Sequence, residues 1–460
     1  MRHQANPSQS AASVSTDLFR NRLDAQIDLR HPLCKLAAVM PWEAMVQRLS
    51  KLLPAEPKAG GRPALSLRLM CGLLYLKHAY NLSDEALCER WLENPYWQFF
   101  CGEVFFQTGF PCDPSSLTRF RKRLGEAGVE ELLAQSIEAA KSLQAIKPAD
   151  LERVIVDTTV QEKAVAYPTD SRLFEVARRK LVLLARRQGI ELRQSYEREG
   201  PTLRRRAAGY AHAKQFKRLR RVLKRQRTIL GRLLRDVQRK ATVEQQAALA
   251  PWMLRIERLA QQKPKDKNKL YALHAPEVEC IGKGKARNPY EFGVKVGLAV
   301  TANKGLIVGA RSFPGNPYDG DTLAEQIEQV CILTDQKPKT VIVDLGFRGR
   351  ALDGINILHR GMKKLTRTQK RWLKRRQSIE PIIGHAKDDC GLRRCYLKGA
   401  LGDAMHAVLC AAGYNIRWLM RWIALLLPAI LVVLGRISGA LHAMSLSAAQ
   451  PHRALRFSGA

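Results

Sequence analysis

The sequence predicts an α/β core that follows an all-α N-terminal domain and is interrupted by a long, basic helical insert. Two runs of β-branched residues each end on an aspartate, at Asp157 and Asp344. A later stretch places Glu380 between two cations, Arg376 and Lys387. The 460 residues carry 77 Lys+Arg against 42 Asp+Glu, a formal charge of +35. An excess of that size favours a polyanionic partner, DNA or RNA.

The N-terminal part has the pattern of a small helical domain. Residues 1–30 are polar and are expected to be loose, whereas 31–145 show amphipathic helical spacing divided by turn residues. Residues 118–124 hold four cations in seven positions. This pattern predicts a DNA-binding domain of the helix-turn-helix type, and the alternative is a helical packing domain with solvated arginines. The expected DNA contacts are Arg119, Arg121 and Arg123.

Residues 150–425 are expected to form the α/β core. The β-branched pattern predicts strands at 152–160, 290–301, 305–313 and 339–344, with a helix at 322–334 between the last two. Strand, hairpin, helix, strand and then a helix bearing Glu380 is the order of a ribonuclease H-like fold.

The insert, at about 170–270, is the most basic part of the chain. From Ser171 to Lys240 there are 23 Lys+Arg against five Asp+Glu. Apolar residues recur there at spacings of three and four, which predicts a helical hairpin folded on itself or on the core. The seam consists of Phe216, Leu219, Leu223, Gln226, Leu230, Leu233 and Val237. The charge density favours contact with phosphates over a merely solvated hairpin.

Further DNA contacts are expected in and after the insert. In the insert they are Lys214, Lys217 and Arg218. Lys283 and Lys285 lie among glycines and would suit a DNA-contacting loop, with an ordinary basic turn as the alternative.

Asp157, Asp344 and Glu380 are the candidate catalytic residues. If the two strands are parallel neighbours, their carboxyl ends lie close together, and the later helix can return Glu380 to the same crevice. Mg²⁺ prefers carboxylate oxygens, so the three residues are a suitable protein share for two divalent ions, Mg²⁺ or Mn²⁺. The spacing of Arg376, Glu380 and Lys387 places cations on either side of the glutamate, where phosphates would lie.

Several longer segments follow one another in the order found in a known family. They are 156–163, 210–218, 273–285, 290–295, 315–320, 344–349 and 376–387. On these segments the chain resembles, over nearly its whole length, the DDE-type bacterial transposases of the insertion-sequence-five family. Two positions depart from the family pattern: Leu373 stands in a tyrosine position, and Asp321 stands where relatives commonly have histidine.

The resemblance implies that Asp157, Asp344 and Glu380 are the metal-binding triad of a ribonuclease H-like transposase. Such an enzyme binds the terminal inverted repeats of its insertion sequence, cuts the DNA to leave a 3′-hydroxyl and transfers that end to target DNA. Pairing two ends implies at least a homodimer in the synaptic complex. The alternatives are another ribonuclease H-like nuclease and a decayed or repurposed DNA-binding protein without catalysis.

The sequence also bears on nucleotide cofactors, redox compartment and membrane contact. No phosphate-binding GxxxxGK[ST] loop occurs, so no nucleotide cofactor is expected. The ten cysteines form no CxxC pair, which favours a reducing compartment. Residues 426–460 are expected to be an apolar segment and a loose tail. The apolar stretch 422–434 is shorter than a membrane span, so a cytoplasmic, nucleoid-associated protein without membrane contact is expected.

Overall fold

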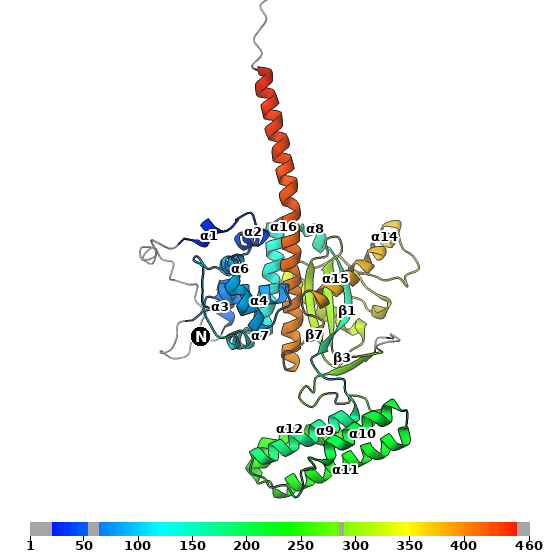
Figure 1. Ribbon diagram of the computed structural model, residues 1–460. Coiled ribbons are helices and arrows are strands. Elements are labelled where there is room, and N and C mark those ends of the chain that lie inside the picture. The colour runs from blue at the N-terminus through cyan, green and yellow to red at the C-terminus, as the bar shows by residue number, and fades with distance from the viewer. Residues whose placement is uncertain (1–20, 54–63, 283, 285–288, 449–460) are drawn as a thin grey trace, which may run out of the picture. The chain divides into compact units, whose positions relative to one another are not determined.

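A computed structural model describes residues 21–53, 64–282, 284 and 289–448 (Figure 1). Contacts divide the chain into two compact units. The first contains the N-terminal part up to Arg123, residues 134–147 and the chain from Ala412 onward, and the second contains 124–133 and 148–411. The sequence placed the end of the core near residue 425. The chain leaves the second unit earlier because Asn415 donates a hydrogen bond to Ser136 Oγ (2.9 Å) and Arg417 to Ala79 O (3.0 Å).

The described part of the first unit is built from helices around an apolar core. Helix α7, whose residues 124–133 belong to the second unit, is interrupted at Gly125, whose φ of 62° and ψ of −165° are not helical. A positive φ costs glycine little, so the chain bends there. The helices are α1 (Leu23–Gln26), α2 (Pro32–Val39), α3 (Trp42–Leu52), α4 (Leu67–Ala79), α5 (Asp84–Glu93), α6 (Pro95–Phe100) and α7 (Ser115–Ser142).

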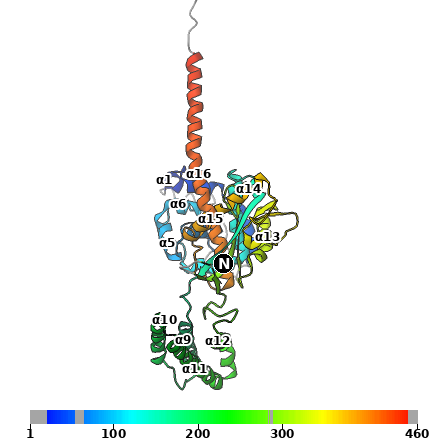
Figure 2. The same cartoon turned by 90° about the vertical axis from the view of Figure 1, so that its right-hand side faces the viewer.

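The second unit is organised around a seven-stranded mixed sheet (Figures 1 and 2). Its central strand, β1 (Arg153–Lys163), is antiparallel to β3 (Tyr290–Thr301) on one side and parallel to β5 (Thr340–Ile342) on the other. Next to β3 lies β4 (Ile307–Phe313), which is antiparallel to it, and next to β5 lies β6 (Asn356–Leu358), which is parallel to it. Two short strands complete the sheet: β2 (Glu279–Gly282) pairs with β3, and β7 (Arg394–Cys395) pairs with β1. The strands expected from β-branched runs are therefore present.

Helices cover this sheet. Helix α13 (Leu323–Thr334) packs on β3 and β4, and a Cβ added at Gly309 would lie 2.6 Å from Gln326 Nε2. Only glycine lets the helix approach so closely. Helix α15 (Ile379–Asp388) packs against β1. The shorter helical elements are α8 (Pro148–Leu151), η3 (Asp319–Thr322), η4 (Leu345–Phe347), α14 (Arg367–Arg375) and η5 (Arg376–Ser378).

The insert is a four-helix subdomain with a hydrophobic core of its own. Its helices are α9 (Asp170–Arg187), α10 (Glu199–His212), α11 (Phe216–Lys240) and α12 (Val243–Gln261). The segments that enter and leave it meet on β3, where the rings of Tyr167 and Tyr271 lie 5.3 and 5.4 Å from that of Phe292. The expectation of a helical hairpin is corrected, because α9 and α12 pack with α11 and make the insert a four-helix bundle.

The second half of the expected seam on α11 is buried, from Gln226 to Val237, whereas Phe216 is 56% exposed. Val222, Ile229 and Leu234 are buried as well. The buried stripe is broader than a two-helix seam because α11 contacts α9, α10 and α12.

The last described element is a long helix, α16 (Gly399–Ala448), which includes the apolar stretch 422–434, while the end of the expected tail, 449–460, lies outside the described residues. Among the described residues, no helix has the length and apolar character needed to cross a membrane.

Candidate active site

Asp157 and Asp344 lie at corresponding points of two neighbouring parallel strands. Ile155 on β1 is paired in register with Ile342 at the end of β5. Each aspartate follows its paired isoleucine by two residues, so the two lie side by side. Asp344 comes just after the end of β5, whereas Asp157 lies within β1, opposite Leu298 of β3. Asp157 is held in place by its neighbour, because the Thr158 backbone N–H donates to Asp157 Oδ1 (2.8 Å).

Glu380 reaches these aspartates from the first turn of α15. Pro381 is the third residue of this helix, where a proline removes no intrahelical hydrogen bond. The glutamate side chain is 62% exposed, whereas that of Asp157 is only 19% exposed. The three carboxylates thus span the depth of the site from the sheet edge to the surface.

Arg376 connects all three carboxylates. Its Nη1 lies 3.3 Å from Asp157 Oδ2, its Nη2 3.3 Å from Glu380 Oε1, and its Nε 4.0 Å from Asp344 Oδ1. The side chain is only 9% exposed. Arg376 lies beside the glutamate, as the sequence predicts, and its assignment as a DNA contact stays a prediction. The turn of η5 between α14 and α15 directs the guanidinium inward, between the acidic groups.

The same arrangement shows that a cation fits between these carboxylates. One guanidinium is within 4.0 Å of all three, and the donor set consists entirely of carboxylate oxygens, as Mg²⁺ prefers. Burial raises the pKa of the Asp157 carboxyl above its ordinary value. The Thr158 backbone N–H and Arg376 lower that pKa, whereas Asp344 and Asp319 raise it further. Positive charge at this point would stabilise the ionised aspartate.

Asp319 is a fourth carboxylate of the site that sequence reasoning did not single out. Its Oδ1 accepts hydrogen bonds from Thr158 Oγ1 (3.0 Å) and Lys295 Nζ (2.8 Å). A Cβ added at Gly346 would lie 3.0 Å from Asp319 Oδ2. Asp319 therefore contacts the segments that follow both strand-end aspartates. The available signal was its place in the turn at 315–320, one of the segments on which the family resemblance was noted.

The structure also places Lys387 and Leu373, two further positions of the pattern around Glu380. Lys387 is partly buried on α15, seven residues after Glu380 and hence on the same helical face. Leu373, in the expected tyrosine position, is buried on α14. The adjacent Trp372 ring lies 3.7 Å from the guanidinium carbon of Arg153.

The arginines expected to bind DNA in the first unit do not share one environment. Arg119 is exposed and Arg123 is partly exposed. Arg121 is 3% exposed and donates from Nη1 (2.9 Å) and Nη2 (2.5 Å) to the carboxylate of Asp84. The expectation that Arg121 contacts DNA is wrong, because its guanidinium is used inside the unit.

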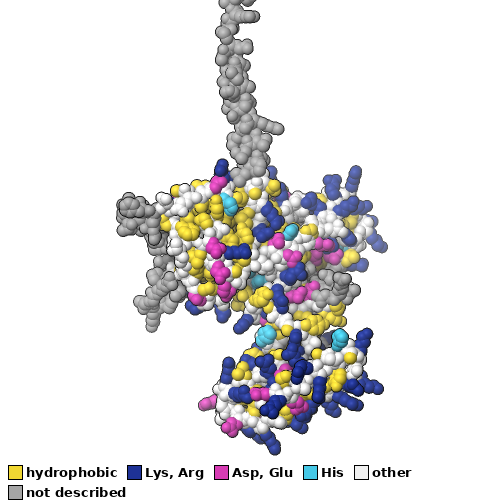
Figure 3. All heavy atoms as spheres, viewed as in Figure 1, with side chains coloured by type: hydrophobic (Ala, Val, Ile, Leu, Met, Phe, Trp, Pro, Cys, Tyr) yellow, Lys and Arg dark blue, Asp and Glu magenta, His cyan; other side chains and the backbone are white. Residues whose placement is uncertain are grey.

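The insert presents the expected basic surface. Lys214, Lys217 and Arg218 are all exposed at the turn from α10 to α11. Figure 3 shows Lys and Arg side chains gathered over this subdomain. Lys283 and Lys285, the other expected contacts, lie outside the described residues.

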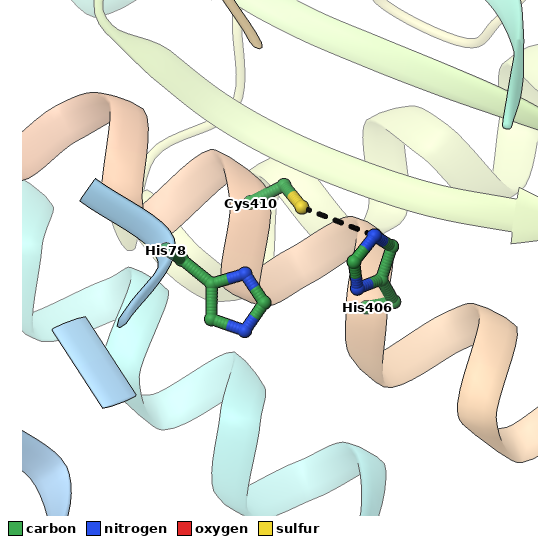
Figure 4. A group of neighbouring side chains, drawn as sticks. All are labelled: His78, His406 and Cys410. Carbon is green, nitrogen blue, oxygen red and sulfur yellow. Dashed lines mark hydrogen bonds between the residues drawn. The ribbon is translucent and has the colours of Figure 1, made fainter. Parts of the chain in front are cut away.

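A histidine–cysteine pair lies near the start of α16. Figure 4 shows His406 and Cys410 one turn apart on α16, with Cys410 Sγ 3.6 Å from His406 Nε2. The same nitrogen lies 3.0 Å from the carbonyl oxygen of Gly391. A carbonyl oxygen only accepts, so Nε2 is the donor. The bond ties the start of α16 to the turn that follows α15.

Comparison with known proteins agrees with this geometry. Residues 21–123 match a family model described as a transposase domain, and residues 261–416 match one described as a transposase DDE domain. The chain is 53% identical over 205 residues to a Rhizobium meliloti protein described as "Uncharacterized protein ORF8 in nfe locus". That alignment covers 45% of this chain and 97% of the relative. No solved structure matches.

The chain therefore carries a transposase DDE domain. The two family matches lie on either side of Asp157 and of most of the insert. In this transposase the sheet register, and not sequence proximity, brings Asp157 next to Asp344 of the matched DDE segment.

Proposed function

We propose that this transposase cuts DNA at the terminal inverted repeats of an insertion sequence and transfers the released end to target DNA. The observation that carries the proposal is the convergence of Asp157, Asp344 and Glu380 on one cation. We assign these residues as the DDE triad, which holds two divalent ions, Mg²⁺ or Mn²⁺. When bound, such ions activate the attacking oxygen and stabilise the leaving oxygen of a phosphodiester.

We further infer that the core is ribonuclease H-like. The strand order β4-β3-β1-β5-β6, with the first three antiparallel and the last three parallel, supports this inference. The carboxylates lie where the parallel pairing of β1 with β5 ends, which is the ordinary place for a site in an open α/β sheet.

The residues of the chain act on the DNA by position and charge. Asp157, fixed by the Thr158 N–H, and Asp344 offer their oxygens from the rigid sheet, while Glu380 closes the site from α15. Asp319 and Lys295 hold the neighbouring segments in register. Lys387, Arg119, Arg123 and the insert cations Lys214, Lys217 and Arg218 would bind phosphates. We infer at least a dimer, because two element ends must be joined in one reaction. The segments at 156–163, 210–218 and 376–387 support the further proposal that the enzyme is of the insertion-sequence-five family.

The proposal is tested with labelled duplexes that carry the inverted repeats flanking the gene. Substituting Asp157, Asp344 or Glu380 by alanine should reduce Mg²⁺-dependent cleavage by about 100-fold or more. Removing a residue that only orients a metal ligand can already lower activity by up to about 100-fold, and removing the ligand itself should lower it at least as much. End binding should persist. Asp388→Ala is the matched control, because it removes an exposed carboxylate from the same helix. Undiminished cleavage by any triad variant would refute the assignment. Cut products without joined strands would instead favour a nuclease.

A further inference from the structure

A hollow of about 490 Å³ lies in the insert, where the segment after α9 faces the second half of α11. Arginines surround it. Arg232, Arg235 and Arg239 project from one face of α11 at spacings of three and four, and Arg193 comes from the facing segment. Tyr196 and Asp236 are also in its wall. The hollow is thus formed by two segments whose cations converge on one space.

The arginines around the hollow outnumber its carboxylates. Asp236 is the only carboxylate among the residues that line the hollow. Its Oδ1 pairs with Arg239 (2.6 Å), and its Oδ2 accepts the backbone N–H of Arg193 (2.8 Å). Within the described residues, the guanidinium groups of Arg193 and Arg235 make no hydrogen bond or ion pair, and both side chains are exposed. Converging cations that outnumber the neighbouring carboxylates favour an external anion.

The wall of the hollow is held rigidly. Tyr196 has a φ of 54°, a left-handed conformation that is costly for a bulky residue. Arg178 donates to Ser195 O (2.8 Å) and is paired with Glu175 inside the bundle, and Gly200 N donates to Tyr196 O (2.9 Å). The Tyr196 hydroxyl in turn accepts a hydrogen bond from Arg232 (3.4 Å). Local strain that several contacts maintain is typical of a preorganised site.

We propose that this hollow is a discrete phosphate-binding site that takes the backbone of a DNA strand through Arg193, Arg232 and Arg235. Guanidinium forks match phosphate oxygens, and three of them on two segments can hold neighbouring phosphates. The inference rests on the proposed DNA function and deepens it, because it locates the contribution of the insert in a defined pocket. A free nucleotide has the same phosphate chemistry, so the test must separate the two sources.

The test is DNA binding by the full chain, measured by fluorescence anisotropy at increasing KCl. In the double variant Arg232→Ala/Arg235→Ala we expect binding to weaken by about tenfold, and the slope of log K against log salt to fall by about 2, one unit for each phosphate that no longer meets a guanidinium. The matched control is Arg204→Ala/Arg205→Ala, which removes the same charge from exposed positions of α10. Arg232→Lys/Arg235→Lys keeps the charge without the fork and should bind with intermediate affinity.

The outcomes are separable. If the hollow variant and the α10 control weaken binding equally, the hollow is not a distinct site. If the mononucleotide dAMP saturates the wild-type hollow while the variants bind DNA normally, the ligand is a free nucleotide and the inference fails. If wild-type protein binds and cuts element ends but the hollow variants keep its salt slope, only this inference is overturned. Failure of the wild type to bind any DNA would remove the proposed function as well.

Discussion

At the scale of single residues, Arg376 determines the charge balance of the candidate site. It is the cation within 4.0 Å of Asp157, Asp344 and Glu380. Three carboxylates so close together repel one another unless a positive charge lies between them. The arginine therefore stabilises the site without a metal ion, and the proposed ions would have to compete with it for the carboxylates.

Substituting Arg376 by glutamine should show both the stabilisation of the site by the arginine and its competition with the proposed metal ions. In EDTA we expect the melting temperature to fall by about 1 °C for a loss of about 1 kcal/mol, because the entropy of unfolding grows with chain length. Added MgCl₂ should then raise the melting temperature of the variant more than that of the wild type. Differential scanning fluorimetry measures both. Arg375→Gln is the control, since Arg375 donates to Asn303 O and not to the carboxylates. Equal Mg²⁺ shifts in all three proteins would contradict the role of Arg376.

Arg121 and Arg119 are two residues apart on α7, but one is buried and the other is exposed. Arg121 is buried and paired with Asp84, which also binds Lys77 at 2.9 Å. Arg119 is exposed. We expect Arg121→Ala to lower the free energy of unfolding by about 3 kcal/mol, because it leaves a buried carboxylate less compensated. Arg119→Ala should change it by less than about 0.5 kcal/mol and should weaken DNA binding instead. Urea unfolding measures the change in stability of each variant, and fluorescence anisotropy measures its affinity for DNA.

The Arg121 effect should also depend on pH. Burial raises the pKa of Asp84, but the hydrogen bond from Arg121 and the charge of Lys77 outweigh it, so the net pKa is lowered. A lowered pKa contributes stability above the pKa of the unfolded state and loses it as pH falls through the folded value. The stability difference between wild type and Arg121→Ala should therefore be largest near neutral pH and shrink in acid. A difference that grows in acid would contradict this origin.

At the scale of elements, the strands were predictable, because buried strands favour β-branched runs. The end of β1 was not, since the strand continues past Asp157 to Lys163. The parallel pairing of β1 with β5 confirms that Asp157 and Asp344 lie side by side. The inward direction of Arg376 was not predictable, since it depends on the short η5 turn between two helices. Asp319 was missed because it follows a loop, where no periodicity tells which way a side chain points.

The insert illustrates the same limit. Its seam predicted a buried face on α11, and Leu230, Leu233 and Val237 are buried. The pattern of one helix cannot say how many partners it has, however. Val222 and Ile229 widen the buried stripe because α9, α10 and α12 all contact α11. The number of helices in a bundle is set by contacts between segments distant in the chain, which the spacing along one helix does not encode.

At the scale of the whole molecule, net charge is the property most closely tied to the proposed function. The chain carries a formal +35, and about half of it lies in the 70 residues from Ser171 to Lys240. Such an excess raises the local concentration of polyanions and releases counterions when DNA binds. Specific recognition of the repeats would be added to this general attraction.

The affinity of the full chain for DNA should therefore fall steeply with salt. If the six exposed cations Lys214, Lys217, Arg218, Arg193, Arg232 and Arg235 each contact a phosphate, affinity should drop on the order of 10³-fold between 50 and 200 mM salt. Anisotropy titrations with repeat-containing and scrambled duplexes measure the slope. Lys217→Gln/Arg218→Gln should reduce it by about 2 on both duplexes alike, because phosphate contacts carry no sequence information. A wild-type affinity that changes less than about tenfold over this range would mean that few of these cations bind phosphate, and that the charge of the insert serves another purpose.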